Sequence, residues 1–259
     1  MKALVGKRAC VTGASAGIGR ATALRLAELG AEVVLVARRE ERLKELAAEI
    51  AELGGKALVA ALDLADLDRL QEVVGKQLAQ GPIHIVVNNA SGPAPGPLLA
   101  AKPADFQAAL GVHLFAAQTL VQSCISGMKA TGYGRIINVI STSVREPIPN
   151  LGVSNTVRGA MASWSKTLSR ELPSGITVNN VLPGFTATER LSGLRADLAK
   201  RRGISEAEVE AAWLATVPEG RLAQPAEVAA AIGFLASPEA GFIRGVNLAV
   251  DGGRTASIA

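Results

Sequence analysis

The stretch Val11-Thr12-Gly13-Ala14-Ser15-Ala16-Gly17-Ile18-Gly19-Arg20 indicates which fold this chain adopts. It follows a short apolar segment at residues 8–11, typical of a strand, and opens an amphipathic segment at residues 18–29, typical of a helix. Glycines let the backbone turn tightly and approach a ligand, and the free amide groups at a helix N-terminus suit a pyrophosphate. The spacing G-x-x-x-G-x-G is a variant of the dinucleotide-binding fingerprint, with an ordinary strand-to-helix loop as the alternative.

Strand-like and helix-like segments alternate over all 259 residues. Apolar residues make up 49% of the chain and aromatic residues only 3%, so the core must consist of Ala, Val, Leu and Ile. Such a core is typical of a parallel sheet with helices on both faces. We therefore expect one α/β domain over residues 1–259, a doubly wound, Rossmann-like sheet without internal repeat or linker. The expected strands cover residues 8–11, 32–37, 57–62, 83–87, 135–140, 176–182 and 246–250, and the expected helices cover residues 18–29, 41–53, 67–78, 103–129, 152–172 and 225–235.

The composition argues against several classes of function. The net charge of +4 is spread along the chain, and no basic stripe with interleaved aromatic residues indicates a nucleic-acid partner. Two histidines and two cysteines, Cys10 and Cys124, give no metal-ligand spacing, and we expect both cysteines to be buried. Neither a signal peptide nor an uninterrupted apolar run of about 18 residues is present. We therefore expect a cytoplasmic protein without a membrane segment.

The end of the second expected strand favours one nicotinamide cofactor over another. An NAD-binding fold carries an acidic residue there, which binds the ribose 2′-hydroxyl group. This chain has Ala37, Arg38 and Arg39 instead, and a guanidinium group suits a 2′-phosphate through charge-assisted hydrogen bonds. The alternative is that the arginines cap a helix and pair with Glu40 and Glu41. The missing acid predicts NADP, with NAD still possible.

Polar residues follow three further strands at the edge where a sheet of this type holds its ligands. Asp63, followed by Leu64, could accept a hydrogen bond from an adenine amino group or cap the next helix. Asn88, Asn89 and Ala90 could line the cofactor cleft, bond neighbouring loops, or do both. Pro183-Gly184 ends the sixth strand, and the charged helical segment that follows, at about residues 188–221, is either a substrate lid or a surface excursion.

Together these pieces resemble the short-chain dehydrogenase/reductase family, of the classical type that includes 3-oxoacyl-acyl-carrier-protein reductases. The resemblance covers the whole chain. It implies an NADP-dependent oxidoreductase for a small carbonyl or hydroxyl substrate, assembled as a homotetramer through the long helices and the C-terminal strand. The motifs that resemble those of the family are Thr12–Gly19 as the cofactor loop, Asp63 as the adenine contact, Asn88-Asn89-Ala90 with Ser91 in place of a glycine, Pro183-Gly184 with Thr186 and Thr188 as the carboxamide-binding motif, and Val250-Asp251-Gly252-Gly253 as the C-terminal signature.

The resemblance implies a set of cofactor contacts, which are Gly13, Ser15, Gly17, Ile18, Gly19, Arg38, Arg39, Asp63, Leu64, Asn89, Ala90, Arg158, Pro183, Gly184, Thr186 and Thr188.

The catalytic positions depart from the family pattern. The family has a serine after the fifth strand, a tyrosine thirteen residues later, a lysine four beyond the tyrosine, and an asparagine on the preceding long helix. Ser141 occupies the serine position, but Ser154 replaces the tyrosine, Arg158 the lysine and His113 the asparagine. Serine has no acidity comparable to that of tyrosine, and arginine does not release its proton.

The departure leaves the proton source open. One hypothesis is that Ser141 and Ser154 hold a water connected to His113, whose ordinary pKa near 6.5 would let it supply protons; Arg158 would bind the ribose hydroxyls as a fixed cation. His113 is otherwise a core histidine. A protein of the same fold without catalysis, acting as a sensor or assembly partner, is the alternative function.

Four aromatic or imidazole side chains are expected to have no part in the chemistry. We expect His84 at the surface, because no partner pattern surrounds it. Tyr133, the only tyrosine, precedes the fifth strand and should lie away from the ligand edge. Trp164 and Trp213 are expected to serve packing or an interface.

Overall fold

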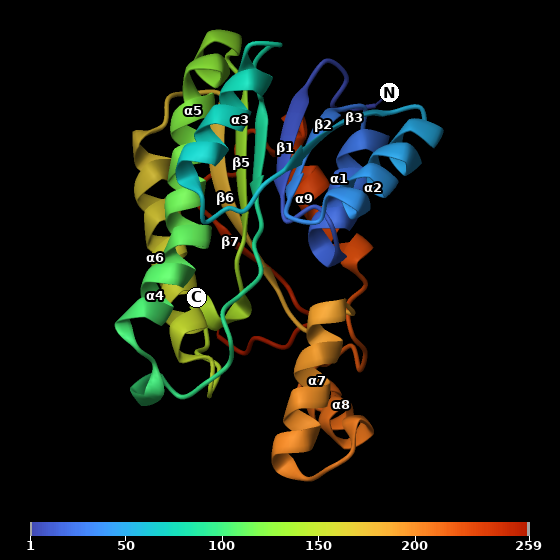
Figure 1. The fold of residues 1–259 in the computed structure, drawn as a ribbon, viewed down its shortest axis with the longest axis vertical. Coiled ribbons are helices and arrows are strands. Elements are labelled where there is room, and N and C mark those ends of the chain that lie inside the picture. The colour runs from blue at the N-terminus through green and yellow to red at the C-terminus, as the bar shows by residue number, and fades with distance from the viewer. Residues whose placement is uncertain (1, 258–259) are drawn as a thin grey trace.

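A parallel sheet runs through the part of the chain that the computed structural model describes, residues 2–257 (Figure 1). Its seven strands lie in the order β3-β2-β1-β4-β5-β6-β7, which confirms the doubly wound fold. The strands are β1 (Arg8–Thr12), β2 (Glu32–Ala37), β3 (Lys56–Ala61), β4 (Ile85–Asn88), β5 (Gly134–Val139), β6 (Ile176–Pro183) and β7 (Asn247–Val250). The order reverses between β1 and β4, and in such sheets ligands bind in the crevice at that point, outside the carboxyl ends of the strands.

Helices cover both faces of this sheet (Figure 1). One face holds α1, α2 and α9, whose apolar side chains share a core cluster with Val11, Leu35 and Val87. The other face holds α3, α5 and α6 around Cys10, Val34 and Val86. The helices are α1 (Gly17–Glu28), α2 (Glu40–Glu52), α3 (Leu67–Leu78), α4 (Pro103–Leu110), α5 (Ala116–Thr131), α6 (Gly152–Glu171), α7 (Glu189–Arg202), α8 (Glu206–Leu214) and α9 (Pro225–Ala236). Successive strand residues alternate between the two clusters, so the central strands are buried on both sides, whereas the edge strands β3 and β7 are only partly buried.

The long helix expected at residues 103–129 contains a single wide turn. Residues Gly111–Phe115 form a π-helical turn between α4 and α5, and His113 lies on it, buried. Such turns are frequent at functional sites. By length and composition the whole run, Pro103–Thr131, could cross a membrane, but its α5 part packs into the core through Leu120 and Met128.

A row of asparagines crosses the C-terminal half of the sheet. Asn88, Asn138, Asn180 and Asn247 are register partners on β4, β5, β6 and β7. Each side-chain amide donates to the next residue in the row, at 2.7, 2.9 and 2.7 Å. Ser165 on α6 donates to Asn180 and accepts from Asn138, both at 2.7 Å. Because buried polar groups are costly unless paired, this row holds four strands in one register.

The charged segment that follows β6 forms α7 and α8, a helical pair that projects from the sheet at its carboxyl edge (Figure 1). Thr188 caps α7 by accepting from the Leu191 amide, and Ser205 caps α8 within a capping box. Trp213 on α8 stacks on Phe185, with ring centroids 5.0 Å apart, which ties the pair to the loop after β6.

Of three expectations about single side chains, the one for His84 is wrong, and those for the cysteines and Tyr133 are confirmed. His84 is buried, not at the surface, because its Nδ1 accepts a hydrogen bond from the Arg8 amide at 3.1 Å. Both cysteines are buried as expected. Tyr133 donates to the Ala236 carbonyl at the amino-terminal side of the sheet, away from the ligand edge, as expected.

Candidate active site

A cleft of about 700 Å³ lies at the carboxyl edge of the sheet, around the strands β1 and β4. Fifteen of the predicted cofactor contacts line it, which are Gly13, Ser15, Gly17, Ile18, Arg38, Arg39, Asp63, Leu64, Asn89, Ala90, Arg158, Pro183, Gly184, Thr186 and Thr188. Gly19, the remaining one, does not line the cleft but packs against Gly13 and Asn89, which do. A volume of this size is in the range of small-molecule and cofactor pockets.

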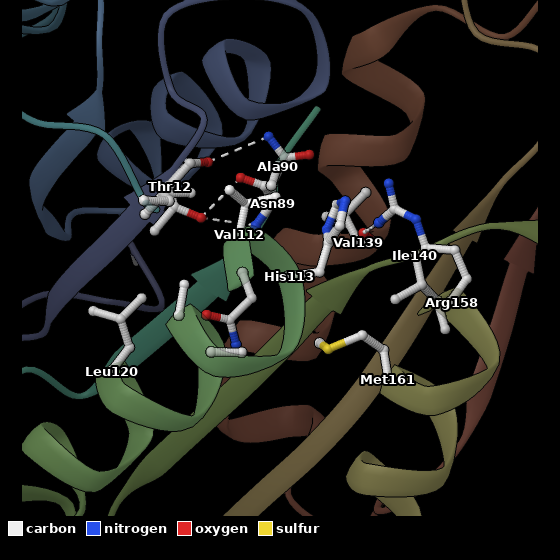
Figure 2. Close-up of a pocket in the computed structure, with 14 residues that line it drawn as sticks. Thr12, Asn89, Ala90, Val112, His113, Leu120, Val139, Ile140, Arg158 and Met161 are labelled. Atoms are coloured by element: carbon white, nitrogen blue, oxygen red, sulfur yellow. Dashed lines mark hydrogen bonds between the residues drawn. The ribbon is translucent and has the colours of Figure 1, made fainter. Parts of the chain in front are cut away.

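The glycine loop is held against the loop that follows β4. Thr12 Oγ1 donates to the Asn89 carbonyl and accepts from the Asn89 amide, both at 2.8 Å (Figure 2). Gly13 has a φ of 61°, and a Cβ there would lie 2.6 Å from Asn89. A Cβ at Gly19 would overlap the Gly13 carbonyl oxygen. The loop therefore needs glycine at both positions, and it leaves the N-terminus of α1 open to the cleft.

Arg38, Arg39 and Asp63 form what we call the outer end of the cleft. Arg38 Nη1 lies 3.7 Å from Asp63 Oδ2, and Arg39 Nε donates to Ser15 Oγ at 3.2 Å. The Arg38 side chain is 73% exposed. The expected alternative pairing of these arginines with the acids at the start of α2 is not observed, because Lys44 takes both of those carboxylates. The helix-capping alternative for Asp63 is wrong as well, since Asp66 caps α3.

Arg158 and Arg190 line what we call the inner end, three strands away, and His113 lies behind it. Arg158 on α6 is 7% exposed, and its Nη1 donates to the Val139 carbonyl at 3.0 Å. Figure 2 shows His113 and Arg158 extending from their two helical segments toward Val139. Both side chains therefore meet behind the carboxyl end of β5.

Burial and positive charge at the inner end lower the pKa values of His113 and Arg158. The pKa of His113 is lowered to about 3, mainly by burial and next by the charge of Arg158. A hydrogen bond with the Ser91 backbone opposes this shift, and the charge of Arg190 contributes to it. Burial, and then the charge of Arg190, lower the pKa of Arg158 to about 10. The expectation that His113 titrates near pH 6.5 is therefore wrong, because a buried imidazole beside a guanidinium group stays neutral.

A small cavity of about 10 Å³ lies behind the cleft and shares a wall with it. Three residues that line it have a buried polar atom without a hydrogen-bond partner: Asn88 Oδ1, His113 Nε2 and Arg158 Nε. The volume matches one water-sized sphere, and two to four polar partners are what a buried water needs.

The two serines of the predicted catalytic set are close to cleft residues along the chain: Ser141 follows Ile140, and Ser154 lies one helical turn before Arg158 on α6. Neither Ser141 nor Ser154 lines the cleft in the described part of the chain. Ser141 Oγ accepts from the Ser143 amide at 3.1 Å, which leaves its own O–H free to donate. Ser154 is half-buried in the first turn of α6.

Arg190 is one of the cleft residues that the sequence did not predict. It lies in the first turn of α7, lines the cleft, and donates from Nη2 to the Pro93 carbonyl at 3.0 Å. The only signal in the sequence is a cation two residues after the predicted contact Thr188.

Comparisons with known proteins agree with this geometry. The family model described as enoyl-(acyl carrier protein) reductase matches residues 13–255. The 3-oxoacyl-[acyl-carrier-protein] reductase FabG of Vibrio harveyi is 35% identical over 253 residues, covering 96% of this chain and 98% of that protein. The short-chain reductase protein NovJ of Streptomyces niveus is 36% identical over 250 residues, covering 95% and 93%. The L-sorbose reductase of Gluconobacter frateurii, solved with NADPH and L-sorbose, superposes with a TM-score of 0.93 at 31% identity and covers 100% of both chains.

A parallel sheet with a glycine loop at its switch point defines a Rossmann-type nucleotide-binding protein. With the matches above, the chain belongs to the short-chain dehydrogenase/reductases, a family of oxidoreductases.

Proposed function

We propose that this protein is an NADP(H)-dependent oxidoreductase that interconverts a small carbonyl compound and the corresponding alcohol, similar to the 3-oxoacyl reductases. The observation that supports it most is the cleft itself, because fifteen predicted contacts from distant parts of the chain line one cavity. The named activity of the relatives and the NADPH in the L-sorbose reductase structure add support.

The residues present fit NADP(H). The glycine loop and the N-terminus of α1 would hold the pyrophosphate, and the space kept open at Gly13 and Gly19 is what close approach of a backbone to phosphate requires. Arg38 and Arg39 would bind the 2′-phosphate, and Asp63 the adenine. Pro183, Gly184, Thr186 and Thr188 would hold the nicotinamide carboxamide. When bound, NADPH supplies the hydride.

Ser141 and a buried water would complete the reaction. Ser141 directly follows Ile140, which lines the cleft, and its O–H would donate to the substrate carbonyl oxygen and so favour the negative charge that develops there. A water in the small cavity, held by Asn88, His113 and Arg158, would give a proton to that oxygen, and the hydroxide left behind would take a proton from solvent. His113 orients this water as a neutral imidazole and does not charge.

We also expect a cytoplasmic homo-oligomer. Phe234 on α9 and Phe242, just before β7, are exposed, the latter fully. Large exposed apolar side chains on neighbouring segments favour an interface between copies.

One observation favours the second candidate function, a nucleotide-binding protein without catalysis. Among the residues at the inner end, none is a titratable acid near pH 7, because His113 is held neutral and Arg158 remains charged.

The two candidates differ in turnover. We propose to titrate the protein with NADPH and then to follow NADPH oxidation at pH 7 with a broad panel of ketones and aldehydes. Oxidation that Ser141→Ala reduces about tenfold or more supports the oxidoreductase. NADPH binding without oxidation in the wild type supports the non-catalytic protein, and the absence of NADPH binding contradicts both.

A further inference from the structure

The inner end of the cleft holds two positive charges, those of Arg158 and Arg190, and no carboxylate among residues 2–257 pairs with either of them. The acid beside Arg190 in the sequence, Glu189, lies instead near Arg39 and Arg42, at 3.5 and 4.0 Å. Arg158 is buried, and an uncompensated guanidinium group in a buried position is strongly unfavourable. Arg190 is exposed and adds a second positive charge at the mouth of the same place, so an anion is expected where the two converge.

The guanidinium groups of Arg158 and Arg190 both lie close to Gly92. An added Cβ at Gly92 would lie 3.1 Å from Arg190 Nη2 and 3.5 Å from Arg158 Nη2. Gly92 lines the cleft, and its φ is in the ordinary range, so the backbone does not demand glycine there. The absence of a side chain at Gly92 keeps this place open to a ligand.

The three nitrogen atoms of the Arg158 guanidinium group have different surroundings. Its Nη1 donates to the Val139 carbonyl, its buried Nε belongs to the small cavity, and its Nη2 faces Arg190 at Gly92. Arg190 is tethered to Pro93 across the cleft, so α7 and the loop after β4 together frame the place. Burial also lowers the pKa of both guanidinium groups, as expected for cations that await a counter-ion.

Two other partners explain the pair less well. The ribose hydroxyls are neutral and need no second cation. The pyrophosphate is expected at the N-terminus of α1, where the glycine loop holds it. A carboxylate, by contrast, is planar and takes hydrogen bonds from two guanidinium groups at once.

We propose that Arg158 and Arg190, with Gly92 between them, form a subsite for a carboxylate group of the substrate. The substrate class is then an oxo acid, or the corresponding hydroxy acid. This inference rests on the proposed function, because it places the subsite beside the reacting end of the cleft.

Binding measurements test the subsite without requiring turnover. The probes are 4-oxopentanoate, 3-oxocyclohexanecarboxylate and 4-oxocyclohexanecarboxylate, each with its methyl ester, titrated by calorimetry into protein saturated with NADP⁺. At least one acid should bind about tenfold or more tightly than its ester. Arg190→Gln should remove that preference. Gly92→Leu fills the space between the two arginines without changing a charge, and it should lower the affinity for the acid.

The matched control is Arg201→Gln on the same helix, which is exposed and should leave the preference unchanged. If no acid binds better than its ester, the subsite does not exist. If Arg190→Gln lowers NADP⁺ affinity about tenfold and leaves the acid preference intact, Arg190 binds the pyrophosphate and the inference is overturned. Failure of NADP⁺ itself to bind would contradict the proposed function instead.

Discussion

At the outer end of the cleft, Arg38 and Arg39 are largely exposed and lie near the carboxylates of Asp63 and Glu189. At the inner end, Arg158 is buried, and its nearest charged neighbour in the described residues is another arginine, Arg190. The first arrangement costs little in the empty protein, because exposed charges are well solvated. The second is costly until an anion arrives. We infer from this contrast that the outer end can bind and release an anion at little cost, whereas an anion at the inner end would also stabilise the protein.

The largest expected effect is a loss of NADPH affinity when the glycine loop, which lies between the two ends of the cleft, is displaced. Gly19→Val places a branched side chain against the Gly13 carbonyl and displaces the glycine loop. NADPH affinity should fall by more than about a hundredfold, because the pyrophosphate loses the N-terminus of α1. Calorimetry on the folded variant measures it.

The control is Gly75→Ala on α3, where an added Cβ meets nothing within 4 Å. It should bind NADPH like the wild type. Undiminished binding by a folded Gly19→Val protein would remove the loop from its assigned role.

A second variant tests the electrostatic contrast. Arg158→Met should lower turnover roughly a hundredfold, because the water and the substrate lose a buried partner. The free energy of unfolding of the empty protein should stay level or rise by about 1 kcal/mol, since an unpaired buried charge is gone. Urea denaturation and steady-state rates measure both effects.

Arg39→Met provides the outer-end comparison. Its charge is half exposed and paired, so no gain in the free energy of unfolding is expected. A loss of 2 kcal/mol or more in Arg158→Met would show that the buried arginine stabilises the empty fold, contrary to the account.

The pH dependence of stability gives a smaller effect. The pKa of His113 in the folded protein, about 3, lies below its ordinary value of 6.5, so the unfolded chain binds one more proton between these values. This group therefore contributes its full stability above pH 6.5 and loses about 1.4 kcal/mol per pH unit as the pH falls toward 3. In His113→Asn that loss should be absent. Urea titrations at pH 5, 6 and 7 compare the two proteins.

His84 is present in both proteins, so the difference between the two curves isolates His113. Parallel pH dependences would mean that His113 titrates near its ordinary pKa, and the hypothesis that His113 supplies protons through a bound water would then regain support.

The sequence predicts the fold and the outer end well because both depend on local patterns. Alternating apolar segments and the glycine loop identify the sheet and its switch point, and Arg38 and Arg39 follow directly after β2. The asparagine row escapes such reasoning, since it depends on the register of four strands from different parts of the chain.

The inner end depends on features that have no local signature. The π-helical turn that positions His113 interrupts an otherwise regular helical pattern. The low pKa of that imidazole arises from burial and from Arg158, 45 positions away in the chain. Arg190 reaches Pro93 across the cleft, which only the folded chain reveals. Likewise, His84 is buried by a contact with Arg8 on a neighbouring strand.

The most direct test of the account is the cofactor preference of the outer end. We propose equilibrium titrations of NADPH and NADH against the wild type, Arg38→Ala and, as a control outside the cleft, Arg42→Ala. One charged contact with a 2′-phosphate is worth about 1.5–3 kcal/mol, so the wild type should bind NADPH roughly ten- to a hundredfold more tightly than NADH. Arg38→Ala should lose most of that preference and Arg42→Ala should keep it. Equal affinities of the wild type for both cofactors, or a preference that survives in Arg38→Ala, would contradict the account.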